Sequence, residues 1–149
     1  MNSGRQDPGH TLDAMSHSTG AAQSCRPAAP RILVVDDAPE VRQIHTRLLY
    51  GSGMEVFTAE NGTLALDAAR RAVPDVIVTD VDMPVMNGLD LCRQLRADAA
   101  TRDVVVVVVT GDASEQAQAA LNAGCDAVLG KPCSRTLLLA TIRLLLERR

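Results

Sequence analysis

The stretch VIVTDVDMPVMNG, residues 76–88, carries an aliphatic run directly into Asp80 and Asp82, and then into a Met-Pro and an Asn-Gly pair. A carboxylate at the end of a buried strand is costly unless another group stabilises its charge. This strand and its acidic end therefore predict a functional site here, and other segments of the chain must supply the group that holds the charge.

Apolar runs alternate with helical patterns from Arg31 onward. The runs indicate five strands, which are RILVVDD (31–37), MEVFTAEN (54–61), DVIVTD (75–80), DVVVVVVTGD (103–112) and CDAVLGKP (125–132). Serial strand–helix alternation with continuous apolar runs indicates a parallel sheet covered on both faces. Right-handed crossovers then predict an α/β fold with a doubly wound, five-stranded parallel sheet in the order 2-1-3-4-5, of the flavodoxin-like type.

Turn residues predict where the intervening helices begin and end. Helices are expected over residues 39–51, 62–71, 88–98, 112–123 and from Ser134 nearly to Arg149, with Gly51 and Gly124 as stops and Asn61, Asp112 and Ser134 as N-caps. We expect Ile44 to lie on the apolar face of the first helix, and Leu64 to face inward on the second.

The first 30 residues differ from the rest of the chain. They are rich in Ser, Gly, Pro, Ala and polar groups and have no apolar period, which predicts a disordered tail over residues 1–30 before a domain over 31–149. No charged start leads into an apolar run, so no secretory signal is expected. The apolar segment 137–146 is too short, and is interrupted by Arg143, so no membrane insertion is expected either.

Composition excludes several classes of function. Aromatic residues make up 1% of the chain, as Tyr50 and Phe57, so a stacking platform for single-stranded nucleic acid is excluded. The net charge of −3 argues against a nonspecific phosphate-backbone binder. Four scattered cysteines form no C-x-x-C pair, which predicts unpaired thiols in a reducing cytoplasm.

Acidic residues end two strands that the predicted order makes neighbours. Asp36 and Asp37 end the first strand and Asp80 ends the third. Crowded carboxylates repel and raise each other's pKa, and a hard divalent cation such as Mg²⁺ removes this cost. Thr110 and Lys131 end the fourth and fifth strands, so a hydroxyl and an ammonium join the acids in the same crevice. This set of groups is typical of a phosphoryl-binding site.

Four motifs, VVDD, TDVDMPVMNG, VVVVTG and LGKP, occur in this order along the chain. Together they closely resemble the receiver domain of two-component response regulators, over residues 31 to about 147. The resemblance implies a phosphoacceptor that receives a phosphoryl group from the phosphohistidine of a sensor histidine kinase or a histidine phosphotransfer protein. It also implies a signalling module that catalyses only its own phosphorylation and dephosphorylation, and that acts on an unknown downstream protein.

The resemblance assigns a role to each site residue. Asp80 is the phosphoacceptor, and Mg²⁺ is held by the side chains of Asp36, Asp37 and Asp80 and by the backbone carbonyl of Asp82. Lys131 contacts the phosphoryl group and precedes a cis bond to Pro132. Thr110 is the switch hydroxyl that moves toward the phosphoryl group.

Two features depart from the family pattern. Receivers usually carry Tyr or Phe three residues before the lysine, and that ring turns inward when the threonine moves; here the position is Val128. The usual coupling of threonine to an aromatic ring is therefore missing from this chain. As a second departure, acidic residues, Asp82 and Asp112, occupy the positions that tune the access of hydrolytic water in the family.

Alternatives remain open at this stage. A pseudo-receiver that is never phosphorylated would act as a binding module. Asp80-Val81-Asp82 also resembles the D-x-D of haloacid-dehalogenase-type phosphohydrolases, with Asp82 as acid and base. No helix-turn-helix, cyclase or phosphodiesterase segment follows the last helix in this sequence, so a stand-alone receiver is expected.

Leucines lie on two sides of the last helix. A step of about 100° per residue places one stripe on Leu138, Leu139, Ile142, Leu145 and Leu146, and puts Leu137 and Leu144 opposite it. The helix therefore carries more leucine and isoleucine side chains than one core face needs. We therefore hypothesise a partner surface, or a homodimer through the fourth and fifth helices.

Overall fold

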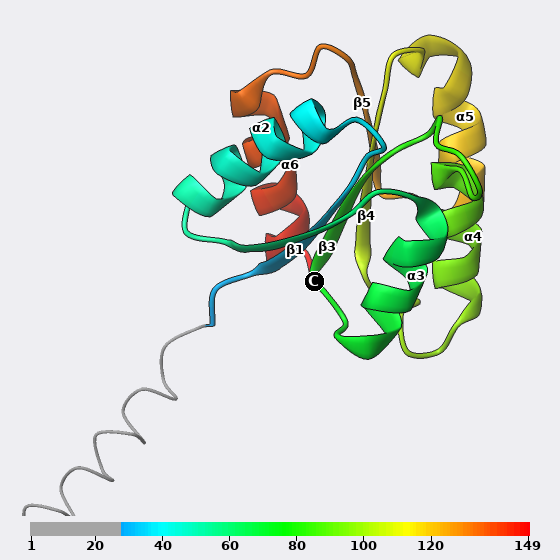
Figure 1. Cartoon of the computed structure of the whole chain (residues 1–149), viewed down its shortest axis with the longest axis horizontal. Helices are drawn as coiled ribbons and strands as arrows, with labels where there is room; N and C mark the ends of the chain where they lie inside the picture. The colour runs from blue at the N-terminus through cyan, green and yellow to red at the C-terminus, as the bar shows by residue number, and fades with distance from the viewer. Residues whose placement is uncertain (1–27) are drawn as a thin grey trace, which may run out of the picture.

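The computed structural model describes residues 28–149, so most of the predicted tail over residues 1–30 lies outside the described residues. Five strands alternate with five helices in this part of the chain (Figure 1). Their bounds are β1 (Arg31–Val35), α2 (Pro39–Gly51), β2 (Glu55–Ala59), α3 (Gly62–Arg71), β3 (Val76–Asp80), α4 (Gly88–Ala97), β4 (Val105–Thr110), α5 (Ala113–Ala123), β5 (Ala127–Gly130) and α6 (Arg135–Glu147).

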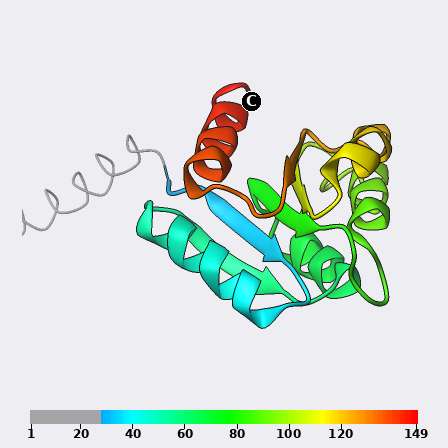
Figure 2. The same ribbon diagram turned by 90° about the horizontal axis from the view of Figure 1, so that it is seen from above.

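The strands form one parallel sheet in the order β2-β1-β3-β4-β5, which confirms the predicted order. Helices α2 and α6 cover one face, and α3, α4 and α5 cover the other (Figure 2). Strand side chains alternate between the two layers: Leu33 and Ile77 pack toward α3, α4 and α5, whereas Ile32 and Val76 pack toward α2 and α6. Both cores are built almost wholly from aliphatic side chains, as the composition requires.

The most apolar runs form the centre of the sheet. Every residue of β3 and of β4 is buried, as expected for strands covered on both faces. β2 lies at an edge and exposes Glu55, which fits the tolerance of edge strands for charge. Because β1 and β3 are neighbours, with Val35 opposite Thr79, the residues that follow these two strands emerge side by side.

Most of the predicted helix ends are correct. The side chains of Asn61 and Ser134 accept N-cap hydrogen bonds from Leu64 and Leu137, and Gly124 ends α5 with φ of 106°. Asp112 occupies the N-cap position of α5, but its side chain makes no capping bond.

The predicted stop at Gly51 coincides with the end of α2. Gly51 is the last residue of α2, and the reversal comes two residues later at Gly53, which has φ of 87°. The amide of Gly53 donates to the carbonyl of Tyr50, and the amide of Met54 donates to the carbonyl of Leu49. This is a Schellman ending, in which a glycine adopts the left-handed conformation just beyond the helix.

Two inner faces were predicted wrongly. The side chains of Ile44 and Leu64 are about half exposed, whereas Leu49 on α2 and Leu66 on α3 are buried. The apolar residues of these short helices fit more than one rotation, and packing on the sheet selects the rotation that buries Leu49 and Leu66. No helix within residues 28–149 has the length and apolar character needed to cross a bilayer.

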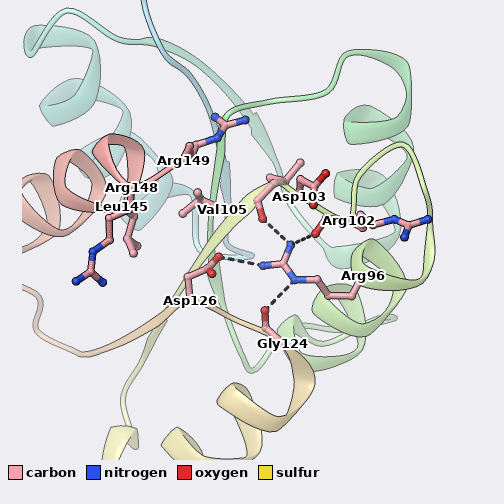
Figure 3. Close-up of a pocket in the computed structure, with 10 residues that line it drawn as sticks. Arg96, Arg102, Asp103, Val105, Gly124, Asp126, Leu145, Arg148 and Arg149 are labelled. Atoms are coloured by element: carbon pink, nitrogen blue, oxygen red, sulfur yellow. Dashed lines mark hydrogen bonds and ion pairs between the residues drawn. The ribbon is translucent and has the colours of Figure 1, made fainter.

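Arg96 joins four segments near the amino-terminal ends of β4 and β5, away from the acidic residues at the carboxyl ends of the strands. Figure 3 shows its bonds. Its guanidinium donates to the carbonyls of Gly124, Arg102 and Val104 at 2.6–2.8 Å, and to the carboxylate of Asp126 at 2.9 Å. The same Asp126 carboxylate accepts from the amide of Val106 at 2.8 Å. Arg96 therefore ties α4 and the turn after it to the starts of β4 and β5.

Replacing Arg96 with methionine removes the four hydrogen bonds of its guanidinium and leaves the carbonyls of Gly124, Arg102 and Val104 without this donor. We expect the free energy of unfolding to fall by about 2–4 kcal/mol, measured by urea denaturation. Arg93→Met is the matched control, because Arg93 lies on the same helix and its one ion pair within the described part of the chain is an exposed pair with Asp90. Its cost should stay below about 0.5 kcal/mol; equal losses in the two variants would contradict the role given to Arg96.

Candidate functional site

Three carboxylates meet where β1 and β3 end. One oxygen each from Asp36, Asp37 and Asp80 can be chosen so that all three lie within 4.8 Å of one another. Asp36 and Asp80 are buried and Asp37 is exposed, so the cluster opens to solvent on one side. Oxygen ligands at this spacing are those that a hard divalent cation such as Mg²⁺ prefers, and the residues present therefore fit the predicted metal.

An ammonium group lies against the buried pair. Lys131 Nζ is 3.3 Å from Oδ2 of Asp36 and 3.3 Å from Oδ2 of Asp80. Lys131 follows β5, and its backbone amide donates to the carbonyl of Thr110 at 2.8 Å. The cis bond between Lys131 and Pro132, which the family resemblance implied, is present.

Backbone amides hold the other oxygen of each buried carboxylate. Oδ1 of Asp36 accepts from the amide of Ala38 at 2.9 Å, and Oδ1 of Asp80 accepts from the amide of Val81 at 2.7 Å. Each side chain is therefore fixed on one side by the backbone and directs its second oxygen toward Lys131. This arrangement holds both carboxylates in a defined orientation before any ligand arrives.

Burial and charge act in opposite directions on these groups. Burial raises the pKa of Asp80, and Lys131 only partly offsets this while Asp36 adds to it. Burial alone would lower the pKa of Lys131, but the carboxylates of Asp80 and Asp36 together raise it. The acids thus hold Lys131 in its charged form, while one ammonium is too little to cancel the cost of burying Asp80.

Gly88 sets the shape of the loop between β3 and α4. Its amide donates to the carbonyl of Val81 at 2.9 Å, and a Cβ added at this position would lie 2.0 Å from the carbonyl oxygen of Asp80. Only glycine permits this approach. Asp82, in the same loop, is exposed, and its side chain is not among the clustered carboxylates of the described residues.

Thr110 ends β4 and is fully buried. Its hydroxyl donates to Oε1 of Gln116 on α5 and accepts from the amide of Asp112 at 3.2 Å. The sequence placed Thr110 at this edge of the sheet, but it gave no role to Gln116. The available signal was the spacing of Gln116 from Asp112. A residue four positions after the N-cap lies about one helical turn further along and on the same side of the helix as the N-cap.

A small apolar pocket adjoins the cluster. It has a volume of about 230 Å³, and its lining residues are Val41, Ile44, His45, Val109, Lys131, Pro132 and Cys133. Burial lowers the pKa of His45, with Asp36 acting against this and Lys131 adding to it. His45 is therefore a neutral side chain beside the site at physiological pH.

Comparison with known proteins identifies the family pattern. A family model described as the response regulator receiver domain matches residues 32–143. The response regulators MprA of Mycobacterium leprae and Mycobacterium bovis are each 42% identical over 118 residues, which is 79% of this chain and 51% of those proteins. The chain thus spans about half the length of these curated relatives.

Solved structures show the same fold. The chemotaxis protein CheY4 of Vibrio cholerae superposes with a TM-score of 0.74 at 33% identity, covering 78% of this chain and 98% of that one. The receiver domain of a sensor histidine kinase from Pseudomonas aeruginosa superposes with a TM-score of 0.75 at 28% identity, covering 80% and 99%. That structure has a magnesium ion coordinated in its active-site cleft. The predicted receiver fold is confirmed.

Changing Asp80 to asparagine removes one clustered charge and keeps the side chain's shape. In metal-free buffer at neutral pH, we expect the variant to exceed the wild type in free energy of unfolding by about 1 kcal/mol, because the buried carboxylate is costly when ionised. The raised folded-state pKa of Asp80 means that the wild type regains this stability as the pH falls. The advantage should therefore shrink toward acid pH.

Urea denaturation with a chelator present, repeated at several pH values, measures both effects. Asp103→Asn is the matched control, because Asp103 is exposed and should change little. An Asp80→Asn variant that is less stable than the wild type at neutral pH would contradict the electrostatic picture.

Proposed function

The chain belongs to the response regulator receiver domain family, and from this we propose that it is a phosphoacceptor in which Asp80 takes a phosphoryl group from the phosphohistidine of a sensor histidine kinase or a histidine phosphotransfer protein. One observation carries the proposal: Asp80 lies within 4.8 Å of two other carboxylates and 3.3 Å from the ammonium of Lys131. A nucleophile, a cluster of metal-ligand oxygens and a cation for the phosphoryl oxygens then occupy one crevice.

The transfer exchanges one bond to phosphorus for another. A carboxylate oxygen of Asp80 attacks the phosphorus, the new O–P bond forms, and the N–P bond to the donor histidine breaks. The electron pair of the broken bond stays on the imidazole nitrogen, which takes a proton from solvent. Lys131 offers its charge to the phosphoryl oxygens, and the amide of Val81 holds Oδ1 of Asp80, so that the attacking group is oriented.

Charge balance supports a requirement for Mg²⁺. Within residues 28–149, the three clustered carboxylates outnumber the one ammonium paired with them, so an incoming anionic phosphoryl group meets net repulsion from these side chains alone. The side chains of Asp36, Asp37 and Asp80 and the backbone carbonyl of Asp82 would hold the ion. Bound there, Mg²⁺ supplies positive charge that offsets this repulsion and stabilises the phosphoryl oxygens.

The remaining assignments follow from the same proposal. We assign the receiver domain to residues 31–149, which the match over residues 32–143 supports. The module acts by protein contact rather than on a small-molecule substrate, and its only chemistry is its own phosphorylation and dephosphorylation. We assign it to the cytoplasm, which the unpaired thiols of Cys92, Cys125 and Cys133 in the described part of the chain support.

Incubation with Mg²⁺ and acetyl phosphate, followed by intact-mass measurement, tests the proposal. We expect one phosphoryl adduct that is acid-stable and base-labile. It should be lost in Asp80→Asn and kept in the control Asp103→Asn. Continuous release of phosphate from generic esters would instead indicate a phosphohydrolase of the haloacid dehalogenase type, and absence of both adduct and turnover would indicate a pseudo-receiver.

The exposed leucines of α5 and α6 support a second part of the proposal, which is a homodimer formed on phosphorylation. Leu121 on α5 and Leu137 and Leu144 on α6 are each about half exposed, and the two helices flank the edge strand β5. Leu138 and Ile142, on the other side of α6, are buried, as the helical spacing predicted. The second side of α6 is therefore available for a partner.

We expect beryllofluoride, a phosphoryl mimic, to raise the mass in solution from that of a monomer to that of a dimer. Changing Leu137 and Leu144 together to glutamate should abolish the increase. Changing Leu64 to glutamate, which alters an exposed leucine on α3, should leave it intact. A monomer with and without beryllofluoride would contradict the dimer.

A further inference from the structure

The hydroxyl of Thr110 has a single proton, and in this structure that proton is committed. It is donated to Oε1 of Gln116, while the hydroxyl oxygen accepts from the amide of Asp112 at 3.2 Å. Thr110 is fully buried, so water offers no ready substitute for either bond. Any new acceptor for this proton must therefore displace Gln116.

The position of Gln116 makes this bond a link between two parts of the fold. Gln116 lies on α5, and Thr110 ends β4. The carbonyl of Thr110 accepts from the amide of Lys131, whose side chain reaches Asp80 at 3.3 Å. One residue thus contacts the lysine segment through its backbone and α5 through its side chain.

The neighbouring strand offers no polar alternative. Val128 on β5 lies beside β4, opposite Val108, and is partly buried against the core on the α5 side of the sheet. Its side chain neither donates nor accepts a hydrogen bond. Gln116 is therefore the side chain that the structure brings to the hydroxyl of Thr110.

We propose that Gln116 and a phosphoryl group on Asp80 compete for the proton of Thr110, so that phosphorylation releases Gln116 and loosens the link from β4 to α5. This inference rests on the proposed function of Asp80 and on the role of switch hydroxyl that the family resemblance implies for Thr110. Gln116 acts through Thr110 and is a positioning residue. A hydrogen bond to a charged phosphoryl oxygen is about twice as strong as one to a neutral amide oxygen, which sets the direction of the exchange.

Thermodynamic linkage gives the test. If Gln116 competes with the phosphoryl group, removing its oxygen must tighten the binding of beryllofluoride in the presence of Mg²⁺. We expect the Kd measured by isothermal titration calorimetry to fall by about 2- to 10-fold in Gln116→Leu, the usual range for one hydrogen bond. Gln116→Glu, which supplies a charged acceptor, should raise the Kd.

Gln118 provides the matched controls. It lies on the same helix, is exposed and bonds to Asn122, so Gln118→Leu should leave the Kd within twofold and Gln118→Glu reports the effect of added charge alone. The effect of Gln116→Leu should vanish when Thr110 is valine, because no hydroxyl is left to contest. A merely structural role for Gln116 would not depend on the hydroxyl in this way.

A measurement on the wild type needs no variant. The side-chain amide resonance of Gln116 in ¹⁵N NMR spectra should shift on addition of beryllofluoride, and that of Gln118 should not. Failure of the wild type to bind beryllofluoride would overturn the proposed function and this inference together. Binding with a Kd unaltered in Gln116→Leu relative to Gln118→Leu, or with no shift at Gln116, would overturn the inference and leave the phosphoacceptor role standing.

Discussion

Repulsion among the carboxylates at the ends of β1 and β3 is the constraint on which the site depends. One oxygen each from Asp36, Asp37 and Asp80 lies within 4.8 Å of the others, and among the described residues Lys131 forms ion pairs with two of these carboxylates at 3.3 Å. Burial raises the pKa of Asp80 despite this ammonium. The folded protein thus holds an excess of negative charge at one point, and an excess of this kind favours the binding of a cation.

The parallel sheet makes this crowding unavoidable. β1 and β3 are adjacent and parallel, so the residues that follow them emerge at one edge, and covering helices on both faces leave that edge as the outlet. The loop after β3 is equally constrained, because the backbone of Gly88 passes so near the carbonyl of Asp80 that no Cβ fits. At the other end of the strands, the hydrogen bonds of Arg96 hold α4 to the starts of β4 and β5. The sheet that carries the acidic site is therefore held in place at both ends of its strands.

The strand order and the meeting of the acids could be predicted from the sequence, because long apolar runs such as that of β4 demand burial on both faces and so define a parallel sheet. Helix rotation was less predictable. Ile44 and Leu64 are half exposed. A short helix with only a few apolar residues is compatible with several rotations about its axis, and tertiary packing chooses among these rotations. Gln116 was not found, because its spacing from Asp112 places it on a side of α5 but does not distinguish a solvated side chain from one bonded to a buried threonine. The roles of the site residues stay predictions.

The location of the bound cation tests the central claim most directly. Crystals grown with Mn²⁺ in place of Mg²⁺ would show the ion by its anomalous scattering. We predict one strong peak in contact with the side chains of Asp36, Asp37 and Asp80 and with the backbone carbonyl of Asp82. A peak elsewhere on the protein, or no peak in crystals grown with saturating Mn²⁺, would contradict the account of these acids as a cation site that prepares Asp80 for phosphoryl transfer.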